Sequence, residues 1–117
     1  MVTITATEFV AMINDRDITA TNAEYLLDQA INELNTFGAD LSNMSGTAAS
    51  KTWSGESKEK GAIVHLARAM YDYLYKRGET VSISSLSVAA IAINDVEVAN
   101  LAKNLAQQLK EIDVSNV

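Results

Sequence analysis

Apolar residues recur every three or four positions along four stretches of the chain, a spacing that places them on one face of an α-helix. The pattern predicts helices over residues 6–14, 20–37, 56–77 and 95–112. In the second of these, the shared face consists of Ala23, Leu27, Ala30, Ile31 and Leu34. The sequence therefore predicts an all-α four-helix bundle that forms a single domain over residues 1–117.

Capping residues support these helix ends. The second helix starts either at Thr19 or at the capping box that begins at Thr21. Gly38 follows the end of that helix, where a glycine can adopt the left-handed conformation without steric cost. Asn94 or Asp95 caps the last helix.

Residues 38–55 are rich in Gly, Ser, Thr, Ala and Asn and show no sustained period, which predicts a loop. This loop exceeds the usual connection in a compact domain, which is typical of a functional segment or of one that is mobile in isolation. Trp53 lies near its end. Trp53 either holds the loop onto the chain's own core or makes a contact between subunits, because aromatic residues concentrate at interface centres.

Residues 81–93 follow a different pattern, in which β-branched and other apolar residues alternate with serine and alanine. Alternation of period two favours an extended or β segment over a helix. Two interpretations stay open. The segment packs on its own domain, or it forms an edge that pairs with a neighbouring copy.

Composition narrows the class of protein. The 117 residues include 15 acids and 9 bases, so the net charge is −6, which is the wrong sign for gripping DNA through its phosphates. The absence of cysteine excludes disulfide frameworks and thiolate zinc sites. No apolar run is long enough to span a bilayer, and no signal-peptide pattern opens the chain. We therefore expect a soluble intracellular protein, or part of a particle assembled inside a cell.

Charge is unevenly distributed along the chain. Residues 1–40 carry seven acids and one base, residues 41–78 carry three acids and six bases, and residues 79–117 carry five acids and two bases. The basic central segment is either neutralised by its acidic flanks within one bundle or complementary to neighbouring copies in an oligomer.

The sequence contains no recognisable catalytic or metal-binding pattern. His65 is the only histidine, so zinc motifs with two histidines are impossible, and no Gly-x-Ser-x-Gly elbow accompanies it. Asp15 and Asp17 lack the remaining ligands of a calcium loop. We therefore expect a chain that is not an enzyme and that binds no metal and no cofactor.

The order of these parts resembles the head–tail connector (adaptor) proteins of long-tailed bacteriophages and related archaeal viruses. The resemblance covers most of the chain. It rests on the D-x-x-I-T turn at Asp15–Thr19, the helical segments Ala23–Ile31 and Ala62–Gly78, and the Ser/Val-rich stretch Val81–Val88 before the final helix.

This resemblance implies a structural protein of the virion neck, between capsid and tail, that is assembled in the host cytoplasm. It implies a homo-oligomeric ring, commonly twelvefold, docked beneath the portal protein, with a stopper or other tail-completion protein bound next. DNA would pass through without specific binding, because an acidic channel wall repels phosphates. Residues Asp113–Val117 would order on docking to the portal. The expected interface residues are Leu41, Met44, Trp53, Val81, Ile83, Leu86, Ile91, Ile93, Val114 and Val117.

Other classes of protein compete with this interpretation. One is a small cytosolic helical protein-binding module or regulator, which would form a stable dimer through the apolar stripe of the fourth helix. Another is an enzyme whose site has no recognised motif. A DNA-binding regulator would use Lys58, Lys60 and Arg68 as a local basic patch, but the net charge opposes it.

Overall fold

The structure is a computed structural model that describes residues 2–13, 18–41, 44–47, 51–76, 89 and 91–115. The described chain is mostly helical, as predicted, and it also contains a small two-stranded sheet that the sequence did not predict. Its elements, in chain order, are β1 (Val2–Thr5), α1 (Ala6–Ile13), α2 (Ala20–Thr36), β2 (Thr52–Gly55), α3 (Ser57–Lys76), the 3-10 helix η2 (Ile91–Asn94) and α5 (Val96–Ser115).

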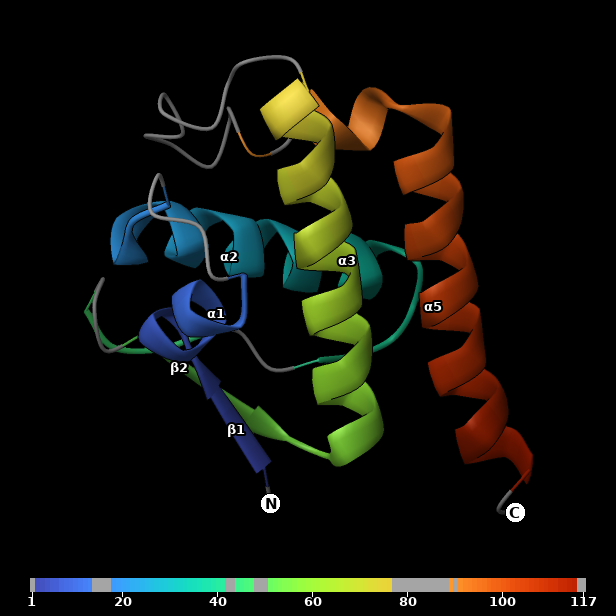
Figure 1. Ribbon diagram of the computed structural model, residues 1–117. Helices are drawn as coiled ribbons and strands as arrows, with labels where there is room; N and C mark the ends of the chain where they lie inside the picture. Colours follow the sequence, from blue (N-terminus) through green and yellow to red (C-terminus); the bar gives the residue numbers. More distant parts are fainter. Residues whose placement is uncertain are drawn as a thin grey trace.

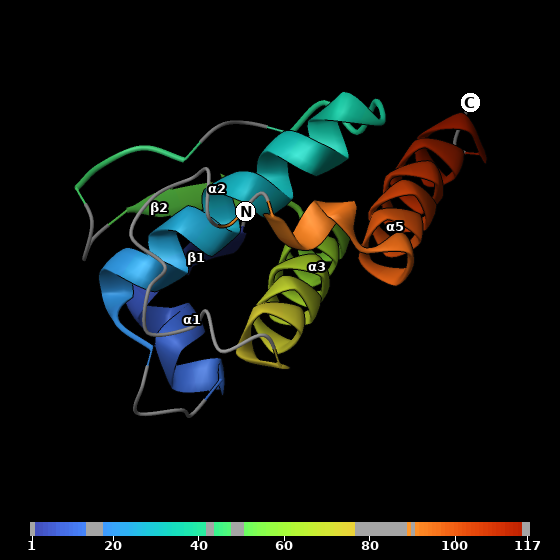
Figure 2. The ribbon, with the colours of Figure 1, turned by 90° about the horizontal axis from the view of Figure 1, so that it is seen from above.

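The long helices α3 and α5 lie side by side and run in opposite directions (Figure 1). Helix α2 crosses behind α3 at a steep angle, and its C-terminal end reaches α5, so that α2 contacts both helices. Helix α1 packs on α2 at the end remote from α5, as the view from above also shows (Figure 2). One side of the α3–α5 pair is therefore covered by α2.

The strands β1 and β2 pair in antiparallel fashion, so the prediction that residues 38–55 form only a loop is wrong for residues 52–55. Ile4 pairs with Trp53, and both side chains are almost fully buried. Thr3 pairs with Ser54 on the opposite face, and both are exposed. The reason for the sheet is tertiary, because pairing lets two distant segments bury Ile4 and Trp53 against the same helices.

The apolar face predicted for the second helix is confirmed. Ala23, Leu27, Ala30, Ile31 and Leu34 of α2 are all buried in the core. They meet the buried face of α3, which includes Ile63, Ala67, Met70 and Leu74. The three- and four-residue spacing thus places these side chains at the contact between α2 and α3.

Local hydrogen bonds explain where the helices begin and end. The Thr19 hydroxyl accepts a hydrogen bond from the Asn22 backbone N–H (3.1 Å), so Thr19 rather than Thr21 is the N-cap of α2. Gly38 has φ +97°, and its N–H and the next one bond back to carbonyls in the last turn of α2, which forms a Schellman motif. Asp95, not Asn94, caps α5.

Residues 81–88 and 90 of the predicted extended segment lie outside the described residues. Ile91–Asn94 forms the 3-10 helix η2, so the extended prediction is wrong for residues 91–93. Ala92 is fully buried where η2 contacts α3 and α5, and its carbonyl accepts a hydrogen bond from the Asp95 N–H (3.1 Å). A tight helical turn therefore brings the chain from the core directly into the cap of α5.

Candidate partner-binding groove between α3 and α5

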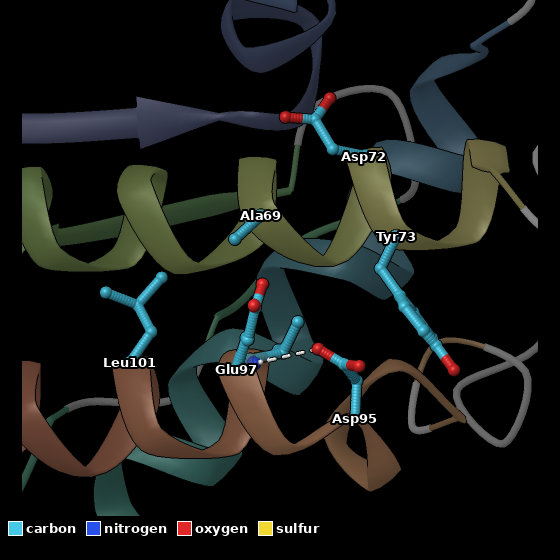
Figure 3. A pocket seen from close by; sticks show the side chains of 7 residues that line it. Ala69, Asp72, Tyr73, Asp95, Glu97 and Leu101 are labelled. Carbon is cyan, nitrogen blue, oxygen red and sulfur yellow. Dashed lines mark hydrogen bonds between the residues drawn. The ribbon is translucent and has the colours of Figure 1, made fainter.

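A groove of about 420 Å³ lies between the C-terminal half of α3 and the start of α5. Ala69 and Tyr73 line it from successive turns of α3, and Val98 and Leu101 line it from the first turns of α5. The C-terminal half of α3 lies beside the start of α5 because the two helices are antiparallel, and Figure 3 shows Ala69 and Tyr73 on the side of α3 that faces α5. Their side chains give the groove a mainly apolar floor, with the phenol ring of Tyr73 at one end.

Three carboxylates, those of Asp72, Asp95 and Glu97, line the edge of this groove. Glu97 extends toward Ala69 across the groove, whereas the Asp72 carboxylate points away from α5 (Figure 3). Asp95 accepts a hydrogen bond from the Val98 N–H (3.1 Å), so its carboxylate already serves as the helix cap. Glu97 and Asp72 are exposed, and neither forms an ion pair with a lysine or arginine of the described chain. The groove thus combines an apolar floor with an acidic rim.

Elsewhere, acids and bases pair within the chain. The Lys51 ammonium lies 3.0 Å from both the Glu24 and the Asp28 carboxylates of α2, and these hydrogen bonds raise the pKa of Lys51 above its usual value. Lys60 of α3 lies 2.6 Å from Glu8 of α1. Two bases of the central segment are therefore neutralised by acids of the N-terminal segment, which is the intrachain alternative that the charge pattern left open.

The predicted interface residues do not gather at this groove. Leu41, Met44 and Trp53 are buried in the core of the single chain, and Ile91 and Ile93 are half-buried beside it. A partner could reach the first three only if the segments around them moved. Val81, Ile83, Leu86 and Val117 lie outside the described residues, and Val114 belongs to α5 in a part whose side chains are not described.

Sequence reasoning missed the groove because its residues lie at the margins of the helical stripes. Ala69 and Tyr73 are half-buried and stand beside the apolar face of α3 rather than within it. The sequence marks Asp95 only as a candidate cap. The available signal was the pair of acids at 95 and 97 close to Leu101, but their position opposite α3 depends on how the two helices pack.

Candidate metal, catalytic and membrane-spanning features can be checked directly in the described chain. His65 is exposed on α3. Within the described ranges, no three or more His, Cys, Asp or Glu side chains are grouped closely enough to hold a metal ion. None of the described helices combines the length and apolar character needed to cross a membrane.

Comparisons with protein-family models, with curated proteins and with solved structures find no match. The resemblance to head–tail connectors therefore rests on the pattern of residues in the sequence, and it stays a prediction. The groove, which comes from the structure alone, is an independent starting point for a function.

Proposed function

We propose that this chain is a structural subunit of a viral head–tail connector, which assembles with copies of itself beneath a portal ring. The observation that carries the proposal is the groove between α3 and α5, whose apolar floor and acidic rim are not covered by any described segment. A surface that combines apolar contact area with a charged rim suits binding to another protein. The order of sequence elements then favours the connector class.

The distribution of charge supports an assembly role. The acids of α1 and α2 that face Lys51 and Lys60 are neutralised within the chain, while Glu97, which extends across the groove, has no cationic partner among the described residues. Uncompensated charges at a contact surface select the partner and the register more than they add affinity. The groove therefore has the properties expected of a contact between subunits.

In this proposal the ring extends the channel through which DNA leaves the capsid. The net charge of −6 disfavours adhesion of phosphates to the channel wall. The ring, commonly twelvefold in the proteins that this chain resembles, would bind the portal on one side and a stopper on the other. The chain would act in the virion neck without catalysis and without a cofactor, and the arrangement of its helices as a four-helix bundle also remains part of the proposal.

A second candidate function is a helical module that binds a single partner protein. The same groove favours it, since a 420 Å³ depression accommodates a few side chains of any basic amphipathic segment. The two functions differ in stoichiometry. A connector forms closed multimers of its own chain, whereas the module forms a dimer or a one-to-one complex.

Sedimentation velocity and negative-stain imaging of the full chain test the proposal. The chain would be measured by itself and together with the portal ring of the virus that carries this gene. Rings of this chain, free or seated on the portal, support a connector. A chain that remains monomeric or dimeric in both conditions refutes it, and so would a gene located away from portal and tail genes.

A further inference from the structure

The outer surface of α5 differs in charge from the groove. At about 100° per residue, Val96, Lys103 and Lys110 fall on one side of α5, and Glu97 and Leu101 lie about 100–180° further round the helix, on a different side. The residues of the first group are all exposed, and Val96 is 71% exposed, the largest value among large apolar side chains of the described chain. One helix thus presents a basic, partly apolar face and contributes to an acidic, partly apolar groove.

The two lysines of this outer face have different surroundings. Lys103 forms no ion pair with a described acid. Lys110 lies beside the C-terminal end of α2, where its Nζ is 3.2 Å from the position that a Cβ at Gly38 would occupy. That position suits a cation, since the C-terminal end of a helix carries partial negative charge. Judged from the described part of the chain, Lys103 is therefore the cation of this face that is available to a partner.

We propose that the groove of one copy receives the outer face of α5 from the next copy, with Lys103 placed against Glu97 and Val96 placed on the apolar floor. This inference rests on the proposed function, for which it names the contact between subunits. The two surfaces match in both respects, because an exposed apolar side chain meets Ala69 and Leu101 while a cation meets the carboxylate rim.

The geometry favours a second copy over an unrelated partner. Both complementary surfaces belong to the same chain, so the contact joins two different patches and each copy still offers one free patch of each kind. Such a head-to-tail contact propagates, and it closes into a ring when the rotation between neighbours divides a full turn. Because the two patches lie on different sides of α5, each can contact a different neighbour, so every subunit binds two copies.

Charge exchange between the two patches tests this contact in the full chain. Glu97→Lys makes the groove repel Lys103, and Lys103→Glu makes the outer face repel Glu97. Each variant alone is expected to associate at least about tenfold more weakly than the wild type, because like charges across an interface are strongly unfavourable. An equimolar mixture restores association, since the Glu97→Lys groove then faces the Lys103→Glu surface and the other contact keeps its native charges.

A matched control is Glu56→Lys, which changes the charge equally at an exposed residue near the start of α3, remote from the groove. Thermal unfolding followed by circular dichroism would verify that all variants fold. Sedimentation velocity over a concentration series gives the association constants, and the control is expected to assemble like the wild type.

The outcomes separate this contact from the proposed function. Weak association of both single variants together with recovery in the mixture supports the contact. Wild-type rings that form equally well with Glu97→Lys and Lys103→Glu overturn the contact and leave the connector function standing. A wild-type chain that stays monomeric, with and without the portal, overturns both. Binding of a basic segment from another protein to the groove, unaffected by Lys103→Glu, also overturns the contact between copies.

Discussion

Replacing Gly55 with alanine is expected to destabilise the chain, because a methyl group there would collide with the Trp53 indole. Trp53 and Gly55 are two residues apart in β2, so their side-chain positions share one face of the sheet. A Cβ built on Gly55 lies 2.4 Å from Trp53 Cζ2 and 2.6 Å from Cη2, and it lies 2.6 Å from Glu59 Oε1. All three distances are far shorter than van der Waals contact.

The two neighbours differ in how easily they can move. The Glu59 carboxylate ends a flexible side chain, although it accepts a hydrogen bond from the Glu56 N–H (3.0 Å) at the start of α3. The Trp53 ring is rigid, only 1% exposed and enclosed by the core. Overpacking of this kind costs about 1–3 kcal/mol. For a domain of this size, that loss lowers Tm by about 4–12 °C.

Chemical denaturation of the full chain followed by circular dichroism measures the free energy of unfolding of Gly55→Ala, and the fluorescence of Trp53 reports its environment. Trp53 is the only tryptophan, so any displacement of its ring changes the whole signal. Trp53→Phe shortens the ring that would collide, and it breaks no hydrogen bond because the indole Nε1 has no partner among the described residues. The cost of Gly55→Ala is expected to fall by at least about 1 kcal/mol in the Trp53→Phe background.

Gly61→Ala provides the matched control, because it makes the same change six residues after Gly55, inside α3. Gly61 is exposed, and nothing lies within 4 Å of a Cβ built there. Alanine in a helix interior is about 0.5–1 kcal/mol more favourable than glycine, so Gly61→Ala is expected to stabilise the chain. A Gly55→Ala protein as stable as the wild type would refute the steric reasoning. So would a loss of stability on Gly55→Ala that is the same in the wild-type and Trp53→Phe backgrounds.

Three further predictions concern charge and backbone conformation. Lys51→Met removes the cation that joins Glu24 and Asp28, so it destabilises the chain at pH 8. Because the pKa of Lys51 is raised above 10.5 in the folded state, the difference in free energy of unfolding from the wild type is present below pH 10.5 and shrinks as pH rises through the folded pKa, as urea unfolding at several pH values would show. Burial raises the pKa of the Glu33 carboxyl above 4.5, so the ionised form costs stability, and Glu33→Gln becomes more stable relative to the wild type as pH rises from 4 to 7. The same difference in free energy of unfolding between the two proteins at both pH values would contradict this. Gly38→Ala costs about 1–2 kcal/mol because φ is +97° there, and Gly38→Asn costs less because asparagine tolerates this conformation better. Thermal unfolding in which Gly38→Asn is the less stable of the two variants would exclude the backbone explanation.

The helices could be predicted from the sequence because their signals are local. The spacing of Leu27, Ala30 and Leu34 marks a buried helical face, and all three side chains are buried. Gly38 marks the end of α2 for an equally local reason, since its positive φ suits a residue without a side chain. The first two helices begin where the sequence predicts, the other helix ends differ from the prediction by one residue, and only the end of α5 lies three residues further along.

The choice between neighbouring capping residues could not be made in this way. Thr19 and Thr21 both precede helical residues, and each offers a hydroxyl at a suitable spacing. The chain begins α2 after Thr19, where the approach from Ile18 buries an apolar side chain in the core. The position of the cap therefore depends on the packing of the residue before it, which the local pattern does not contain.

The sheet and the groove are decided by contacts between distant parts of the chain. Residues 52–55 have the composition of a loop, and they form a strand only because β1 supplies a partner and the core encloses Trp53. The groove exists only where α3 and α5 lie together, so Tyr73 and Glu97 become neighbours without any pattern that links them. Helix periodicity arises from interactions over three or four residues and is visible in the sequence, whereas strand pairing and grooves arise from contacts between segments far apart, so only the tertiary structure determines them.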